Sequence, residues 1–271
     1  MNKEQIYQAV EEESWPEADR RTIYNSQGKG VPRIMPEQYQ ADAYRRFNES
    51  ILLFDNFLRP DLLERLRETC FVMAKKTKGW SKSFFVKNNQ LDPAQEQVME
   101  NRMRPDERLA LDYAIGQVTA EVHRRFNELT HDQVIVKYNT WINTGSIPDH
   151  GESLDKSFHF WHYDSDEYME FCMRQDWIRF PVWGVILYIN EPAGERHYTV
   201  FDDRRINQKI RSITNRLVIF EPSYMHKVIG TNRSDDTEDT RLVMVFNAWD
   251  YDVPDYTQYI NHKYEQEEAE S

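Results

Sequence analysis

The first half of the chain places apolar residues three or four positions apart, which is the spacing of an amphipathic helix. In the segment PDLLERLRETCFVMAKK, which begins at Pro60, the residues Leu63, Leu66, Cys70 and Met73 fall on one side. A second stripe lies within Pro105–Leu129 and comprises Leu111, Ile115, Val118, Val122, Phe126 and Leu129. We therefore expect two helices that pack against a sheet. Short strands are expected beside them, at Ser50–Phe57 and Trp80–Val86.

From Asp132 onward the apolar period shortens from about 3.6 to about 2, which indicates β-strands. The predicted strands are Gln133–Ile142, Ser157–Tyr163, Arg179–Asn190, Arg196–Phe201, Arg216–Phe220, His226–Gly230 and Thr240–Trp249. One predicted helix, DEYMEFCMRQDW over residues 166–177, interrupts them. Strands that follow one another without long helices between them pair antiparallel, so the pattern predicts a sandwich or a jelly roll.

The 271 residues are expected to form a single domain. Its predicted parts are an N-terminal helical support over residues 1–131, a β core over residues 132–250 and a polar, acidic C-terminal tail over residues 251–271. No apolar run approaches the roughly 20 residues that a membrane-spanning helix needs. Residues 1–14 lack the cationic and apolar regions of a secretory signal. We therefore expect a cytoplasmic protein that does not enter a membrane.

Acidic residues outnumber basic ones by 46 to 34, which gives a formal net charge of −12. This charge repels a phosphate backbone, and no cluster of Lys or Arg stands out against it, so nucleic acid is not an expected partner. The composition slightly favours a small-molecule or peptide substrate. The two cysteines, Cys70 and Cys172, are far apart and in no metal-binding spacing, which argues against a disulfide framework and a zinc site.

The segment FHFWHYDSD contains the first candidate metal ligands. His162 and Asp164 are two residues apart, so on an extended strand both side chains project from the same face. A third ligand from a distant strand would complete two histidines and a carboxylate on one side of a metal. His226, in EPSYMHKVIG, is the best candidate, because His159 points to the opposite face and His197 has no partner at ligand spacing. Taken alone, an HxD pair is more often a structural or surface feature.

Arg241 is a second candidate for chemistry. It opens the apolar segment RLVMVFNAW and shares a strand face with Val243 and Val245. A charged side chain that faces a barrel interior is costly unless it meets an anion, and a guanidinium can bind a carboxylate through two parallel hydrogen bonds. The alternative is an ordinary salt bridge at the end of a strand.

In this order the motifs resemble those of the Fe(II)- and 2-oxoglutarate-dependent dioxygenases. The matching segments are HYD, GVILYIN, PAGERHYTVF, RLVIFEPSYMHKV and RLVMVFNAW, and the resemblance covers roughly residues 133–249. It implies an α+β fold with a double-stranded β-helix core, also called a jelly roll or cupin-like core, and packing helices from the N-terminal half. It also implies that His162, Asp164 and His226 hold Fe(II), and that Arg241 binds the far carboxylate of 2-oxoglutarate.

The sequence departs from the family pattern in two places. Many members carry a hydroxyl residue two positions after the arginine, whereas this chain has Val243 there. A second contact to the carboxylate must then come from elsewhere, and Tyr138 is the residue predicted to make it. The hydrophilic segment GTNRSDDTED also lengthens the spacing from His226 to Arg241, and we interpret it as a solvated turn.

The resemblance implies that the chain uses O2 to hydroxylate a small molecule or an amino-acid or peptide substrate, with release of succinate and CO2. Asp164 favours hydroxylation, because related halogenases have a small residue there, and desaturation or cyclisation stays open as an alternative outcome. The loop over residues 143–157 and the helix over residues 166–177 could form a lid, or the helix could be ordinary core packing. Two other functions stay open, namely a cupin-type iron dioxygenase without 2-oxoglutarate and a non-catalytic β-sandwich interaction domain.

Overall fold

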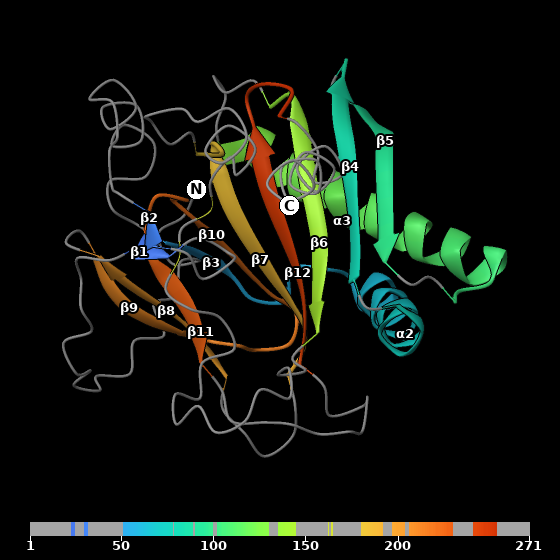
Figure 1. Ribbon diagram of the computed structural model, residues 1–271, viewed down its shortest axis with the longest axis horizontal. Coiled ribbons are helices and arrows are strands. Elements are labelled where there is room, and N and C mark those ends of the chain that lie inside the picture. Colours follow the sequence, from blue (N-terminus) through green and yellow to red (C-terminus); the bar gives the residue numbers. More distant parts are fainter. Residues whose placement is uncertain are drawn as a thin grey trace, which may run out of the picture.

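Two antiparallel sheets form the core of the computed structural model (Figure 1). It describes residues 51–77, 79–88, 90–99, 102–129, 135–144, 162, 164, 180–191, 197–203, 206–229 and 241–253, together with the short strands β1 (Ile23–Tyr24) and β2 (Gly30–Val31). The large sheet has seven strands in the order β3 (Leu52–Phe54), β10 (Arg216–Phe220), β7 (Trp183–Asn190), β12 (Leu242–Trp249), β6 (Lys137–Thr144), β4 (Gly79–Lys87) and β5 (Gln90–Met99). The small sheet has three strands in the order β11 (His226–Ile229), β8 (Tyr198–Asp203) and β9 (Ile206–Arg211).

The chain passes repeatedly between the two sheets. Strand β7 lies in the large sheet, β8 and β9 lie in the small one, β10 returns to the large sheet, β11 to the small one and β12 to the large one. All the strand pairs within the two sheets are antiparallel. This alternation is the double-stranded β-helix, or jelly roll, so the predicted α+β fold is confirmed.

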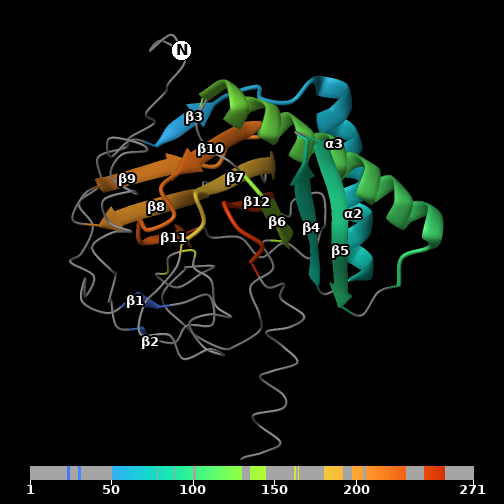
Figure 2. The same cartoon turned by 90° about the horizontal axis from the view of Figure 1, so that it is seen from above.

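Two helices cover the outer face of the large sheet, on the side away from the small sheet (Figure 2). They are α2 (Pro60–Lys76) and α3 (Pro105–Leu129). In α2 the buried residues are Leu62, Leu66, Cys70 and Met73, so Leu62 takes the buried position that the spacing assigned to Leu63. The ring of Phe126 in α3 stacks on Trp183 at 6.0 Å between ring centroids and on Tyr138 at 6.2 Å. This outer face is therefore a continuous apolar core.

The inner face of the large sheet has a second, smaller core. Its buried members are Ile51, Leu53, Ile186, Tyr188, Phe201, Ile210, Val218, Phe220, Tyr224, Val243 and Val245. Phe201 and Ile210 come from the small sheet, so this cluster fills the space between the two sheets. Even positions of β7 and odd positions of β12 belong to it, which assigns alternate residues of each strand to opposite faces.

The predicted elements agree with the structure in most places. The second helix and the strand Arg216–Phe220 have the predicted bounds. The strands β5 and β9 were not predicted. Both lie at the edge of a sheet, where one side of the strand needs no partner, and polar residues or a proline such as Pro93 are tolerated there.

Several predictions lie outside the described residues. They are the helix over residues 166–177, most of the loop over residues 143–157, the segment GTNRSDDTED and the acidic tail beyond residue 253. Of the predicted strand Ser157–Tyr163, the structure describes His162 alone. Within the part that is described, neither helix combines the length and the apolar character that a membrane-spanning helix requires.

Candidate metal centre

A backbone contact brings two distant segments of the chain together at His162 and His226. The amide of His162 donates to the carbonyl of His226 at 3.0 Å, and the amide of His226 donates to the carbonyl of His162 at 2.8 Å. These two bonds form an isolated antiparallel bridge, which continues the small sheet beyond β11. The two imidazole rings lie 4.3 Å apart between centroids. The backbone pairing therefore places two histidines that are 64 positions apart in the sequence side by side.

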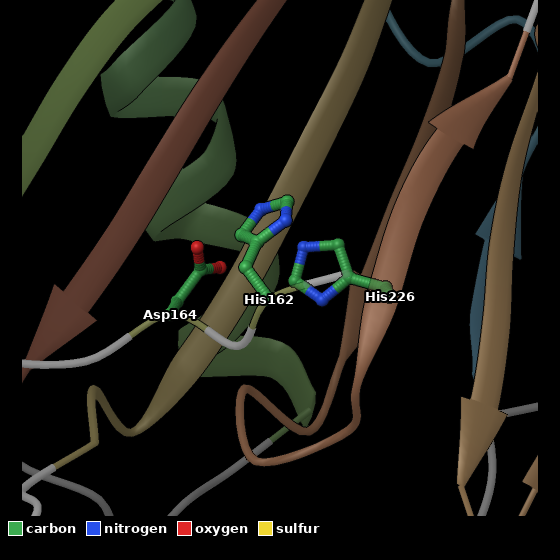
Figure 3. A group of neighbouring side chains, drawn as sticks. All are labelled: His162, Asp164 and His226. Carbon is green, nitrogen blue, oxygen red and sulfur yellow. The ribbon is translucent and has the colours of Figure 1, made fainter. Parts of the chain in front are cut away.

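Asp164 completes a three-residue group (Figure 3). One ligand atom each from His162, Asp164 and His226 lies within 4.8 Å of the other two. A metal ion about 2.0–2.2 Å from each nitrogen and oxygen holds neighbouring ligand atoms roughly 3 Å apart, so the three side chains would close in on a bound ion by rotations about their own bonds. Two imidazoles and a carboxylate on one side of a metal leave its other coordination positions open. The donor set therefore fits a catalytic metal.

The ring of His226 is held in one orientation. Its Nδ1 lies 3.0 Å from the carbonyl oxygen of Tyr224 and donates to it, which leaves Nε2 as the metal-binding nitrogen. Phe220 packs edge-on against the same ring at 5.0 Å between centroids, and Phe201 lies at 5.5 Å. A ligand that is fixed in this way loses little freedom when it binds a metal ion.

The carboxylate of Asp164 is the orphaned polar group of the site. Its Oδ2 atom is buried and has no hydrogen-bond partner. Burial raises the pKa of this carboxyl to about 6, and His162 opposes the shift. A bound dication would favour the charged carboxylate and supply the partner that this oxygen lacks.

Arg241 lies in the interior of the barrel, as its strand face predicted. It is only 3% exposed, and its Nε has no hydrogen-bond partner. No carboxylate among the described residues forms an ion pair with it. Burial lowers the pKa of the guanidinium to about 10, so the group remains charged at neutral pH. A buried cation without a counter-ion is costly, and a bound anion would remove that cost.

Tyr188 and His197 surround this arginine. The guanidinium carbon of Arg241 lies 5.6 Å from the centroid of the Tyr188 ring, and the Tyr188 hydroxyl lies 2.7 Å from Oγ1 of Thr199. Burial, followed by the nearby Arg241, lowers the pKa of His197 to about 4, so this imidazole is neutral at pH 7. Among the residues that the structure describes, the surroundings of Arg241 thus offer hydroxyl and imidazole groups but no negative charge.

Tyr138 does not reach this place, which corrects the prediction that it would share the carboxylate with Arg241. It lies on the outer face of the large sheet, where its hydroxyl is 2.9 Å from Nδ1 of His123 in α3. Val243 is the next residue after Arg241 on the inner face, and its cross-strand partner in β6 is Asn143. The odd-numbered residues of β6 therefore face inward, and Tyr138 faces outward. Tyr188 is the tyrosine that contacts Arg241, and sequence reasoning missed it. Its signal was an inward position beside Ile186 in GVILYIN, but that strand is buried throughout and its apolar residues do not alternate with polar ones.

The fold and the site together define a double-stranded β-helix protein with a two-histidine, one-carboxylate group in its barrel. No family model matches the chain, and no curated protein matches it either. Solved structures to which the chain is similar include IDO from Bacillus thuringiensis, with 11% identity, a TM-score of 0.46 and coverage of 80% of this chain and 98% of that one. An oxidoreductase of the 2OG-Fe(II) oxygenase family from Burkholderia pseudomallei has 12% identity, a TM-score of 0.45 and coverage of 81% and 94%.

A prolyl-4-hydroxylase from Pseudomonas putida has 14% identity, a TM-score of 0.41 and coverage of 73% of this chain and 91% of that one. One fold hosts many reactions, so a likeness of fold does not fix the chemistry of this chain. The function must be argued from its own side chains.

Proposed function

We propose that the chain is an Fe(II)- and 2-oxoglutarate-dependent oxygenase that hydroxylates a small-molecule or an amino-acid or peptide substrate. One observation carries the proposal: ligand atoms of His162, Asp164 and His226 lie within 4.8 Å of one another. Two histidines and a carboxylate with open positions opposite them are the ligand set of non-haem iron(II) oxygenases. The buried Arg241 in the same barrel supports the choice of co-substrate, because its Nε has no hydrogen-bond partner and no carboxylate of the described residues pairs with it.

In this proposal the three ligands hold Fe(II) through nitrogen and oxygen atoms that the fold has already brought together. The carbonyl of Tyr224 keeps the His226 ring turned with Nε2 toward the metal. When bound, iron, O2 and 2-oxoglutarate supply the oxidising chemistry, with succinate and CO2 as co-products. The contribution of the chain is position and a dry surrounding, since Phe201 and Phe220 shield the His226 ring.

Arg241 is assigned the far carboxylate of 2-oxoglutarate. A guanidinium binds a carboxylate through two parallel hydrogen bonds, and burial strengthens that attraction. Tyr188 packs against the guanidinium and limits its orientations. His197 stays neutral and so does not compete for the anion as a second charge.

A spectroscopic titration tests the proposal. Anaerobic Fe(II) and 2-oxoglutarate should together give a weak visible charge-transfer band, and neither should give it alone. Pyruvate is the matched control, because it has the same keto acid end but no far carboxylate for Arg241. We expect half-maximal absorbance at a concentration of 2-oxoglutarate about 100-fold below that of pyruvate, since two charge-assisted hydrogen bonds contribute roughly 3 kcal/mol.

Succinate production in air then separates the possible outcomes. Iron binding without a band and without succinate would indicate an iron dioxygenase that uses no 2-oxoglutarate. Absence of stoichiometric Fe(II) binding would remove the enzymatic proposal altogether and leave a non-catalytic jelly roll.

A further inference from the structure

Two asparagines form a polar patch on the inner face of the large sheet. Asn139 in β6 and Asn247 in β12 are direct cross-strand partners. Asn247 is only 5% exposed, and its Oδ1 atom is buried without a hydrogen-bond partner. Ser83 in β4 donates to Oδ1 of Asn139 at 3.0 Å. We call Asn139 and Asn247 the asparagine pair.

The asparagine pair borders the metal centre through two intervening residues. Asn247 pairs across the sheet with Gly184, and Phe220 pairs with Gly184 from the other side. The Phe220 ring covers this glycine so closely that an added Cβ would lie 2.5 Å from its Cζ. The same ring contacts His226 at 5.0 Å between centroids. The asparagine pair therefore lies on the same face of the sheet as Phe220, with Asn247 two strands away from it, and Phe220 in turn contacts the metal-binding His226.

The asparagine pair lies far along β12 from the residue that is assigned the far carboxylate of the co-substrate. Arg241 and Asn247 share the inner face and are separated by Val243 and Val245. Six residues of extended strand span about 20 Å, which is much longer than a five-carbon diacid. The end of 2-oxoglutarate that binds Arg241 is therefore well removed from Asn247. The unmet acceptor of Asn247 is thus available to a molecule other than the one held at Arg241.

The arrangement of donors and acceptors indicates what that molecule presents. Oδ1 of Asn247 is an acceptor without a donor. Asn139 uses its Oδ1 to accept from Ser83, so its Nδ2 hydrogens remain as donors. The asparagine pair thus offers one acceptor and one donor side by side. The complementary group carries an N–H and a C=O on the same edge, as a primary carboxamide or a cyclic amide does.

We infer that the primary substrate is held by such an amide edge, with Asn247 accepting its N–H and Asn139 donating to its carbonyl. This inference rests on the proposed function for the oxidation that follows binding. The substrate class is then a neutral amide, either a carboxamide side chain or a cyclic amide such as a pyrimidine. Both share the same hydrogen-bonding edge, and the probes below distinguish them.

The test uses amide probes beside matched compounds that lack the N–H. Glutamine is compared with glutamate 5-methyl ester, leucinamide with leucine methyl ester, and uracil with 1,3-dimethyluracil. The first measurement is stimulation of succinate formation from 2-oxoglutarate by the full chain with Fe(II). The second is the relaxation of probe protons by Mn(II) in the metal site, which reports closeness to the metal without any turnover.

Variants assign the effect to the asparagine pair. Asn247→Leu removes the acceptor and keeps the branching at Cγ, and we expect it to raise the KM for the active amide about tenfold or more, since an unmet buried hydrogen bond costs about 1–3 kcal/mol. Asn139→Leu should act in the same direction. Gln117→Leu is the matched control, because it removes a carboxamide from the exposed face of α3. It should leave the KM for the amide unchanged.

Each outcome of these measurements supports or contradicts the amide site. Selective stimulation and relaxation by amides, lost in Asn247→Leu, would support the inference. Equal behaviour of amides and their N–H-free partners, or an unchanged KM in Asn247→Leu, would overturn it. Amides that are relaxed by Mn(II) but support no succinate formation would keep the amide site and remove the oxygenase proposal. Succinate formation that no amide stimulates would do the reverse.

Discussion

The two faces of the large sheet are built from the same strands and differ in their buried polar groups. On the outer face the buried Tyr138 hydroxyl has a partner, Nδ1 of His123, within a largely apolar packing against α2 and α3. On the inner face Arg241 and Asn247 are buried with side-chain atoms that have no hydrogen-bond partner. Since an unmet buried polar group costs about 1–3 kcal/mol, these two residues lower the stability of the ligand-free chain.

The inner face carries some groups that are satisfied within the protein, such as Arg216, and others that would gain energy from something added to it. Two residues with unmet atoms lie along one strand, with Arg241 near its start and Asn247 near its end, and Asp164 lies at the metal centre. We expect that removing polar groups on the outer face lowers stability, and that removing them on the inner face lowers ligand affinity instead.

The largest effect is expected from exchanging a histidine on each face. His226→Ala removes a metal ligand, and the affinity for Fe(II) should fall by more than about 100-fold, because even the loss of an outer hydrogen-bond partner costs 10–100-fold. The thermal unfolding temperature without metal should fall only by the amount that the lost packing against Phe201 and Phe220 accounts for. Fe(II) titration and thermal unfolding measure the two quantities.

His123→Leu is the counterpart on the outer face. It leaves the buried Tyr138 hydroxyl without its partner, so the free energy of unfolding should fall by about 1–3 kcal/mol while Fe(II) affinity stays the same. If His123→Leu weakened Fe(II) binding as much as His226→Ala does, the separation of roles between the faces would be lost.

Two buried arginines on the inner face give the next largest effect. Arg241→Met should raise the KM for 2-oxoglutarate about 100-fold, and it should also stabilise the ligand-free protein by about 1 kcal/mol, because it removes a buried charge without a counter-ion. Arg216 is equally buried but forms a bidentate pair with Asp55, at 2.6 Å and 2.9 Å. Arg216→Met should lower the free energy of unfolding by about 2 kcal/mol. Equal destabilisation by both changes would show that Arg241 is structural.

The same comparison explains which parts of the site could be predicted from the sequence. Arg241 was assigned to the interior because Val243 and Val245 alternate with it along one face. That alternation also places Asn247 inward, but the sequence did not indicate a role for it, because a neutral asparagine at an inward position does not require a counter-charge. The pairing of His226 with His162 joins distant segments; elimination among the other histidines indicated His226, and the order of motifs in a known family supported it.

The prediction that Tyr138 lies beside Arg241 was wrong for a physical reason. Its strand, KYNTWINT, lies between two packed layers and has an aromatic residue on each face, namely Tyr138 outside and Trp141 inside. A period of two then separates the faces but does not say which is the interior. The edge strands β5 and β9 were missed because polar residues are tolerated at an edge.

A pH titration of stability sharpens the comparison further. The pKa of His197 is about 4 in the folded chain and about 6.5 in the unfolded chain. Between these values the unfolded chain binds a proton that the folded chain does not, so this residue lowers stability as pH falls from about 6.5 to 4, by up to about 3 kcal/mol. The free energy of unfolding, measured with urea at pH 7 and at pH 4, should therefore fall less in His197→Gln than in the unchanged chain. Parallel losses in both proteins would contradict the assignment to His197.

The smallest effect is expected from one added methyl group on each side of the sheet. In Gly184→Ala the new Cβ would lie 2.5 Å from Cζ of the buried Phe220, whose ring also supports His226. The ring must move, so the free energy of unfolding should fall by about 1–3 kcal/mol and Fe(II) binding should weaken.

In Gly116→Ala, within α3, the new Cβ would lie 4.0 Å from Phe84, which is ordinary contact. Alanine favours a helix over glycine, so this change should stabilise the chain by about 0.5–1 kcal/mol and leave Fe(II) affinity unaltered. Weakened Fe(II) binding in Gly116→Ala would mean that the helix-covered face also supports the metal centre, and the division between the two faces would no longer hold.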